Sequence, residues 1–306
     1  MRVVIALGGT TLLRRGEPRN ADAQRPTVAD AARAIAAVAR DHGVVVTHGT
    51  GPEGGQAAEV AEPRHVLSPY APQMPNAWSE GRLGGFLEQA LTNEMPGKKI
   101  ARLVTEVTVR LMPVGPRYAD TQDGRRFAAA LGWMVVEDEN WFHRCVPSPE
   151  PAGIAQLNTI NSLIHAGVIV ICACGRGTAA MEAEFELTKS EVIIETDLAA
   201  ALLAERVKAD LLMLLTDEER LEVDWRTGEA LPLGGATTVA ALRRISFAPG
   251  LVGPKVEAAC RFVESTGKRA AIGAITQAAG ILRGDRGVQV TARQAKAKPD
   301  SSRPPN

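Results

Sequence analysis

Continuous apolar runs alternate along the chain with longer segments in which apolar residues recur at helical spacing. The apolar runs predict buried strands at Val3–Leu7, Val44–Thr47, Ile100–Val104, Val168–Cys172, Leu211–Leu215 and Arg269–Ile272. The helical spacing predicts helices at Thr27–Asp41, Pro52–Ala61, Ala77–Thr92, Ala152–Ala166, Asp197–Arg206, Val256–Ser265 and Gln277–Leu282. Strands that alternate with helices are typical of a parallel sheet covered by helices on both faces. The pattern therefore predicts an α/β fold with an open, mainly parallel sheet.

The alternation stops between about residues 109 and 149. This region begins with Met112–Pro116 and ends with Val146–Pro149, both rich in proline, and the pattern between them predicts a helix at Gln122–Leu131 and a strand at Trp133–Glu137. A short excursion between Pro/Gly-rich segments is typical of a lid or protruding subdomain. We therefore expect one domain over residues 1–291, with a subdomain at 109–149 and a disordered tail at 292–306.

Composition and charge limit the classes of partner. The 306 residues are 45% hydrophobic, which is typical of a globular enzyme, and 35 Lys and Arg balance 35 Asp and Glu. A balanced charge and an aromatic content of 4% do not favour a nucleic-acid partner. The chain begins directly on a predicted strand and contains no apolar stretch of transmembrane length, so we expect a cytoplasmic protein without a signal peptide or membrane partner.

The four cysteines do not indicate a metal site or a disulfide framework. Cys172 and Cys174 are separated by one residue on a predicted strand, which is not a zinc-ligand spacing, and Cys145 and Cys260 are far from them in sequence. We expect buried thiols in a reducing compartment and no protein-bound metal.

Three glycine-containing blocks point to phosphate chemistry. Gly8-Gly9 and Gly49-Thr50-Gly51 each follow a predicted strand, and Pro249–Lys255 opens a predicted helix. Glycines after a buried strand let the backbone approach an anion, and a helix N-terminus adds N–H donors and a favourable dipole. Lys255 lies in the first turn of its helix, from which it can reach a phosphate. Together the blocks predict a phosphoryl-transfer site.

Several segments resemble one family throughout the chain. The sequence is similar to the carbamate kinases of the amino acid kinase superfamily in the segments ALGGTTLLRRGEP, HGTGP, PVGPRY, VPSPEP, GVIVICACGRG, DLAAALLAE, DLLMLLTD and FAPGLVGPKVEAACRFVESTGKRAAI. These segments run from about Arg2 to Val290 in the family's order. The resemblance implies a three-layer αβα fold and a homodimer. It also implies exchange of a phosphoryl group between ATP and carbamate, mostly from carbamoyl phosphate to ADP, with the assistance of Mg²⁺.

The resemblance also assigns roles to individual residues. Lys255 matches the lysine that neutralises the transferred group, and Asp197 matches an aspartate that orients catalytic lysines. Thr216 and Asp217 match the start of the nucleotide-binding loop. We expect the catalytic residues Lys255, Asp197, Gly8 and Gly9, the phosphate- and substrate-binding residues Thr10, Gly49, Thr50, Gly51 and Arg176, and the nucleotide-binding residues Thr216, Asp217 and Gly253. Positioned lysines and backbone amides are suited to this chemistry because it needs no covalent nucleophile.

Some positions depart from the family pattern. Thr10 and Thr50 stand where asparagines are usual, and Met112 and Thr196 stand where lysines are usual. Arg176 interrupts a glycine run and is a candidate replacement for a missing lysine as a phosphate clamp. Trp78 occupies a position usually held by glutamate, where it either fills space or lines a pocket for a larger substrate.

These departures keep two alternatives open. One is a related kinase for a different small acid or amide, accommodated at Thr10, Thr50 and Trp78. The other is a degenerate kinase that binds nucleotide without turnover, which the absence of lysine at Met112 and Thr196 favours. A NAD-binding Rossmann protein is not favoured, because the first glycine block lacks the Gly-x-Gly-x-x-Gly spacing.

Structural explanations also exist for single residues. The glycines at 8, 9, 49 and 51 suit tight turns without a ligand, and Lys255 suits a solvated first turn. Asp197 suits a helix N-cap. His48 ends a predicted strand, where a packed, hydrogen-bonded histidine is more common than a catalytic base.

Overall fold

The computed structural model describes most of the chain. The described residues are 1–12, 21–49, 73–109, 116–121, 135–138, 141–147, 150–174, 179–183, 186–190, 194–217, 220–224, 229–232, 234–245 and 252–292. Within these ranges only the backbone is described for residues 9, 10, 21, 73–79, 116–147, 179–190 and 220–234.

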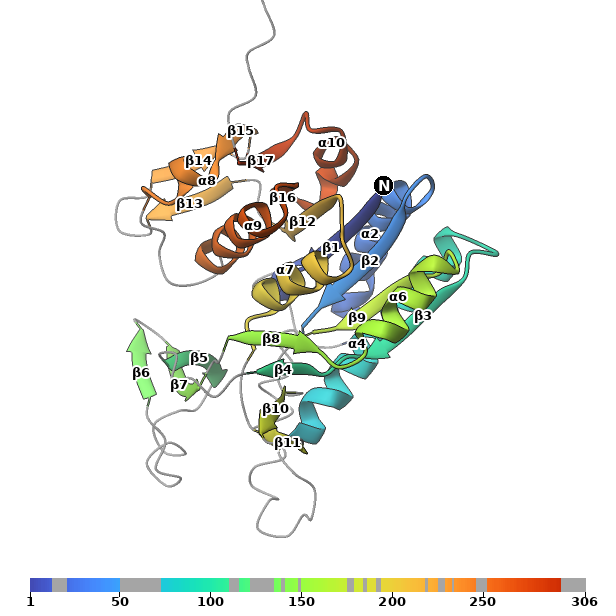
Figure 1. Cartoon of the computed structure of the whole chain (residues 1–306), viewed down its shortest axis with the longest axis horizontal. Coiled ribbons are helices and arrows are strands. Elements are labelled where there is room, and N and C mark those ends of the chain that lie inside the picture. Colours follow the sequence, from blue (N-terminus) through green and yellow to red (C-terminus); the bar gives the residue numbers. More distant parts are fainter. Residues whose placement is uncertain are drawn as a thin grey trace, which may run out of the picture.

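An eight-stranded sheet forms the centre of the molecule (Figure 1). Its strands lie in the order β15 (Gly234–Thr238), β17 (Gly287–Thr291), β16 (Arg269–Ala274), β12 (Leu211–Thr216), β1 (Arg2–Leu7), β2 (Gly43–His48), β9 (Ile169–Ala173) and β3 (Ile100–Val104). All neighbours are parallel except β16 and β17. The six strands that the apolar runs predict are all present and lie side by side. The two strands that were not predicted, β15 and β17, each begin with glycine and carry threonines, so neither forms an apolar run.

Helices cover both faces of this sheet, which makes the fold a three-layer αβα arrangement, as predicted. One face carries α1 (Gly9–Leu12), α2 (Ala21–Ala39), α4 (Gln73–Glu94), η2 (Ile275–Gln277) and α10 (Ala278–Arg283). The other face carries α6 (Leu157–His165), α7 (Thr196–Arg206), α8 (Val239–Leu242) and α9 (Val252–Thr266). Among the helices of the described residues, none has both the length and the apolar character needed to cross a bilayer.

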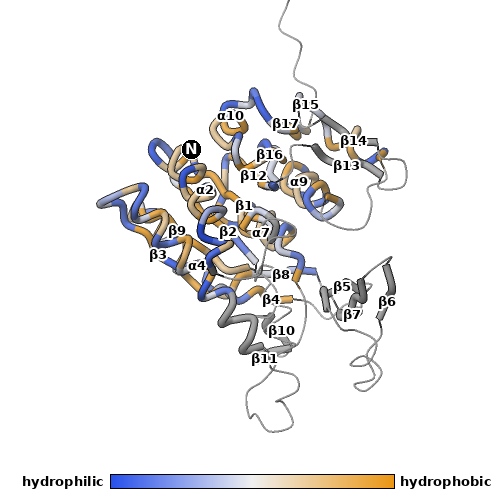
Figure 2. Tube along the Cα trace, turned by 180° about the vertical axis from the view of Figure 1, so that it is seen from behind, coloured by the Kyte–Doolittle hydropathy of each residue, from blue (hydrophilic) through white to orange (hydrophobic). Residues whose placement is uncertain are grey.

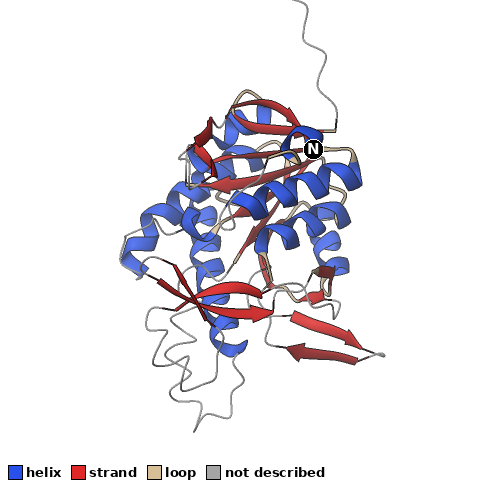
Figure 3. Ribbon diagram, turned by 90° about the vertical axis from the view of Figure 1, so that its left-hand side faces the viewer, coloured by secondary structure: helices blue, strands red, loops and turns tan. Residues whose placement is uncertain are grey.

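Strand β1 shows why the apolar runs are continuous. Val4 and Ala6 pack into the core beneath α7 and α9, whereas Val3, Ile5 and Leu7 pack into the core beneath α2. Because both faces of the strand are covered, every position along it must be apolar. Figure 2 shows the same effect, with hydrophobic residues concentrated on the central strands and the inward sides of the helices. Figure 3 shows the helices on either side of the sheet.

The helix predicted at Ala152–Ala166 is partly wrong. Its first part forms β8 (Pro151–Ile154), and α6 begins only at Leu157. Strand β8 pairs antiparallel with β4 (Val107–Val109), so its residues bond to a neighbouring strand rather than to one another. Gly153 permits this pairing, because a methyl group there would lie 2.6 Å from Thr108 Oγ1. The helix predicted at Pro52–Ala61 lies outside the described residues.

The described residues also form three smaller sheets. Strands β11 (Glu186–Ser190), β10 (Ala179–Ala183), β4 and β8 form one sheet, and β13 (Arg220–Asp224) and β14 (Glu229–Pro232) form a hairpin-like pair. Strands β5 (Pro116–Thr121), β7 (Trp141–Pro147) and β6 (Val135–Asp138) form an antiparallel sheet.

The sheet of β5, β7 and β6 belongs to the region where the sequence pattern breaks. It lies beyond β8 and apart from the eight-stranded sheet in Figure 1. The strand predicted at Trp133–Glu137 corresponds to β6, which is shifted by two residues at its start. The helix predicted at Gln122–Leu131 lies outside the described residues.

Two glycines with positive φ differ in their surroundings. Gly287, the first residue of β17, has a φ of +69°, and a methyl group there would lie 2.7 Å from the carbonyl oxygen of Ile272. Gly267 has nearly the same φ, +68°, but no atom lies within 4 Å of the corresponding point. Alanine substitutions at these two glycines would therefore share the backbone strain, but only the one at Gly287 would also cause steric overlap.

We expect Gly287→Ala to destabilise the protein more than Gly267→Ala. The left-handed conformation costs about 1–2 kcal/mol in either variant, and the overlap with Ile272 adds about 1–3 kcal/mol at position 287. Denaturant unfolding of the two variants would measure the difference. Equal losses would contradict the close contact between Gly287 and β16.

Candidate active site

The parallel strands bring three of the predicted segments to one edge of the sheet. Leu7 at the end of β1 pairs with His48 of β2 on one side and with Leu215 of β12 on the other. Gly8, Gly49 and Thr216 therefore follow or end neighbouring strands at the same edge. Ligands of open α/β sheets bind outside the carboxyl ends of the strands, so this edge is the candidate site.

A buried ion pair lies at this edge. Lys255 Nζ is 3.0 Å from both Oδ1 and Oδ2 of Asp197, and the two side chains are only 6% and 9% exposed. Lys255 comes from the first turn of α9, and Asp197 comes from the first turn of α7. An ammonium ion is strongly disfavoured in a buried position unless it is paired. The carboxylate therefore holds the positive charge in place.

Gly8 lies directly beneath the ammonium group. A methyl group at this position would be 3.1 Å from Lys255 Nζ and 3.4 Å from Thr11 Oγ1. The backbone N–H of Thr11 donates to the Gly8 carbonyl at 3.1 Å, and the Thr11 hydroxyl donates to the carbonyl of Leu215 at 3.3 Å. These bonds fix the turn after β1 against β12, and the missing side chain of Gly8 leaves room for the lysine.

Asp197 is not the N-cap of its helix. The N-cap is Glu195, whose side chain makes no capping hydrogen bond, and Asp197 lies inside the first turn. The capping explanation for Asp197 is therefore wrong, and its carboxylate instead binds Lys255. Lys255 is not a solvated lysine either, because its side chain is buried and its ammonium group binds Asp197.

The predicted nucleotide-binding residues lie on the β12 side of β1. Thr216 is the buried last residue of β12, and its hydroxyl donates to Oδ1 of Asp217 at 3.3 Å. Gly253 is the second residue of α9, two positions before Lys255. Gly49 lies on the other side of β1, after β2. The site thus has two sides, separated by β1 and by Gly8, which follows it.

His48 is a packed histidine, as the sequence favoured. Burial lowers the pKa of its imidazole, so the ring is neutral. Nδ1 lies 2.9 Å from the carbonyl oxygen of Gly49, which can only accept, so Nδ1 carries the proton. Nε2 faces α4, where a methyl group at Gly84 would lie 3.1 Å away. The histidine thereby fixes the first residue of the second glycine block.

Three of the cysteines are buried free thiols. Burial raises the pKa of Cys172 to about 12 and that of Cys260 to about 11, and it also raises the pKa of Cys174. Such thiols are unreactive at neutral pH. Over the part of the chain that the structure describes, no group of three or more His, Cys, Asp or Glu side chains is placed to hold a metal ion.

Several predicted residues are not tested by this geometry. Thr50, Gly51, Arg176 and Met112 lie outside the described residues. Gly9 and Thr10 lie in α1 and Trp78 lies in α4, and the side chains of Thr10 and Trp78 are not described.

Sequence reasoning missed Thr11, which is buried and fixes the turn around Gly8. The sequence feature that could have indicated this role is the second threonine directly after Thr10, at the start of a helix.

Comparisons with known proteins point to one family. Residues 1–274 match the model of the amino acid kinase family. The chain is 40% identical over 304 residues to the carbamate kinase of Rhizobium meliloti (strain 1021), covering 95% of this chain and 93% of that protein. It is 36% identical over 302 residues to the carbamate kinase of Haemophilus influenzae, covering 95% and 97% of the two chains.

A solved structure shows the same fold. The carbamate kinase from Giardia lamblia bound to AMP-PNP superposes with a TM-score of 0.82 at 29% identity, covering 95% of this chain and 98% of that one. The family model and the full-length relatives lead to the same assignment, and the chain belongs to the amino acid kinase family.

Proposed function

We propose that the protein is a carbamate kinase-like phosphotransferase that transfers the phosphoryl group of carbamoyl phosphate to ADP. The observation that carries the proposal is the Lys255–Asp197 pair, which holds a buried ammonium group over Gly8 at the carboxyl edge of the sheet. Relatives named carbamate kinase at 40% and 36% identity over nearly the whole chain support the choice of substrate.

The geometry suits phosphoryl transfer. The bond between phosphorus and the carbamoyl oxygen breaks while an oxygen of the ADP β-phosphate forms the new bond to phosphorus, so carbamate leaves and ATP forms. Negative charge is spread over the oxygens of the transferred group during this step. Lys255 Nζ neutralises part of it, and Asp197 keeps the ammonium from rotating away. Gly8 and Gly49 let the backbone approach the same group from below.

The two sides of the site separate the reactants. We place the nucleotide on the β12 side, near Thr216, Asp217 and Gly253, and the carbamoyl group on the β2 side, near Gly49. The relative from Giardia lamblia bound to AMP-PNP supports a nucleotide site in this fold.

We propose that Mg²⁺ is carried by the nucleotide rather than held by a protein cluster. The described residues offer no group of three metal-ligating side chains, but they do offer Asp217, half-buried at the nucleotide side of the edge. A magnesium ion that entered with the nucleotide would supply positive charge beyond that of Lys255.

A second candidate function is nucleotide binding without turnover. The observation that favours it is Thr196, which opens α7 next to Asp197 where the resemblance leads us to expect a second lysine. A related kinase for another small acid or amide is a third candidate, with its specificity at Thr10, Thr50 and Trp78.

The larger organisation is also a proposal. We propose one domain over residues 1–291 with a protruding subdomain at about 109–149, a disordered tail at 292–306, a homodimer and a cytoplasmic location. The separate sheet of β5, β7 and β6 supports the subdomain, and light scattering of the purified protein would test the dimer.

Lys255→Ala should abolish most turnover. Removing one preorganised charge contact to the transition state typically costs about 100- to 1000-fold in rate. The measurement is ATP formation from ADP, Mg²⁺ and carbamoyl phosphate. Lys268→Ala, which removes an exposed lysine just beyond the same helix, is the control and should keep the wild-type rate. Wild-type protein that binds ADP in calorimetry but forms no ATP would favour the second or third candidate.

Asp197→Leu should destabilise the fold and stop turnover, because it leaves the Lys255 ammonium buried without a partner. Breaking a buried pair in this way costs about 3–5 kcal/mol. The double variant Asp197→Leu with Lys255→Met should regain most of the unfolding free energy and none of the activity. Chemical denaturation and the ATP assay measure the two effects separately. Recovery of activity in the double variant would exclude a catalytic charge at this position.

Gly8→Ala should slow turnover by displacing the lysine. The added methyl group would lie 3.1 Å from Nζ, so the ammonium group must shift by a few tenths of an ångström. Small misplacements of a catalytic group cost up to about 100-fold, and we expect a loss of roughly 10-fold in kcat. Gly43→Ala is the matched control, since its nearest neighbour lies at 3.9 Å. Equal rates in the two variants would contradict the contact.

A further inference from the structure

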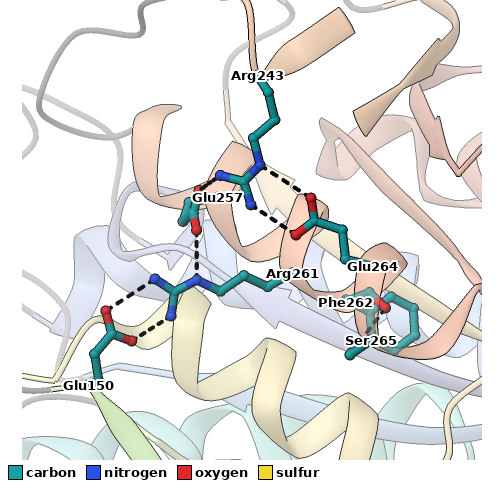
Figure 4. Close-up of polar contacts among 7 residues, drawn as sticks. All are labelled: Glu150, Arg243, Glu257, Arg261, Phe262, Glu264 and Ser265. Atoms are coloured by element: carbon teal, nitrogen blue, oxygen red, sulfur yellow. Dashed lines mark hydrogen bonds and ion pairs between the residues drawn. The ribbon is translucent and has the colours of Figure 1, made fainter. Parts of the chain in front are cut away.

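Five charged side chains form a continuous chain of ion pairs on the surface beside α9 (Figure 4). We name it the ionic chain, and its members in order of contact are Glu264, Arg243, Glu257, Arg261 and Glu150. The signs alternate along it, so each guanidinium group lies between two carboxylates.

Arg261 is the central connection. Its Nη2 donates to Glu150 Oε1 at 3.1 Å and its Nη1 donates to Glu150 Oε2, so the guanidinium group binds both carboxylate oxygens. Its Nε donates to Glu257 Oε1 at 2.7 Å, one helical turn away on α9. This two-point contact fixes the orientation of the carboxylate as well as its distance.

The other half of the ionic chain holds Glu257. Arg243, at the end of α8, donates from Nη1 to Glu257 Oε2 at 2.5 Å and from Nη2 to Glu264 Oε2 at 3.0 Å. Burial alone would raise the pKa of the Glu257 carboxyl, but the hydrogen bonds from Arg261 and Arg243 outweigh it and lower the pKa. Glu257 is therefore ionised at neutral pH and keeps Arg261 aimed at Glu150.

The Glu150 contact joins two distant parts of the chain. Glu150 lies just before β8, at the point where the chain returns from the region 109–149, and it is 111 residues from Arg261. Arg261 lies on α9, the helix whose first turn holds Lys255. VPSPEP and GPKVEAACRFVE, which both belong to the segments that resemble the family, thus contact each other through this pair.

Stability alone is a poor explanation for the contact. Both side chains are 41% exposed, and an exposed ion pair typically contributes little to the free energy of folding. Its geometric effect does not depend on a large energy, because a bidentate contact supported by a third carboxylate defines one relative placement of β8 and α9.

We propose that Arg261 and Glu150 are a positioning pair, which fixes the root of the region 109–149 on the helix that carries Lys255. The pair keeps the start of β8 in a fixed position relative to α9, and thus to Lys255, while the phosphoryl group is transferred. The expected effect on turnover rests on the proposed function, whereas the expected effect on the position of β8 does not.

The test uses Arg261→Gln, Glu150→Gln and the double variant, with Arg33→Gln as a matched control. Arg33 forms an exposed ion pair with Asp30 within α2, on the other face of the sheet. Two quantities are measured on the full-length protein. One is amide hydrogen exchange of the peptides that cover residues 141–154, without ligands, and the other is kcat/KM for carbamoyl phosphate in the ATP assay.

We expect each single variant to speed exchange at residues 141–154 and to lower kcat/KM by roughly 2- to 5-fold, the range of an exposed ion pair. Because the two single variants break the same contact, the double variant should lose no more kcat/KM, and exchange no faster, than the more affected single variant. Arg33→Gln should change neither quantity, and the melting temperatures of all four variants should agree within a few degrees.

Three outcomes would overturn the proposal: wild-type exchange in both single variants, losses that multiply in the double variant, or losses of turnover that simply follow the melting temperature. If the exchange pattern is as expected but the wild-type protein forms no ATP, the positioning pair stands and the proposed function fails.

Discussion

The site depends on one electrostatic constraint, the need to pair an ammonium group inside the protein. Lys255 and Asp197 meet only if α7 and α9 pack closely, since each contributes one member of the pair from its first turn. Both helices carry buried alanines, whose small side chains favour close packing: Ala199 and Ala200 on α7, and Ala258 and Ala259 on α9. The packing of the two helices therefore determines whether the two charged groups can meet at the sheet edge.

The sequence allowed the central sheet to be predicted because strands buried on both faces must be apolar throughout, as in Leu211–Leu215. It did not allow β8 to be predicted, because the choice between helix and strand at Pro151–Ile154 is made by pairing with β4, which is distant in sequence. For the site, local patterns placed Gly8, Gly49 and Lys255 next to strand or helix ends. The contact of Lys255 with Asp197, 58 residues away, came only from the family resemblance, since no local pattern encodes it.

Helix α9 carries two kinds of ion pair with different physical roles. The pair at its first turn is buried, so its loss leaves an unpaired charge in a medium of low dielectric constant. The pairs around Arg261 are exposed and screened by water and salt, so each contributes little energy but a defined geometry. One helix thereby holds the Lys255 ammonium group by strong electrostatics at one end and a neighbouring segment by weak electrostatics further along.

The order of strands around β1 has a consequence for folding during synthesis on the ribosome. On one side of β1 lie β2, β9 and β3, from residues before 174, and on the other lie β12, β16, β17 and β15, from residues 211–291. Gly8 and Gly49 emerge from the ribosome early, whereas Asp197 and Lys255 emerge late. A growing chain therefore exposes the unpaired backbone N–H and C=O groups along one edge of β1 until β12 pairs with it. Lys255 arrives only with the half that covers that edge, so a chain that has not yet reached this residue lacks the buried ion pair.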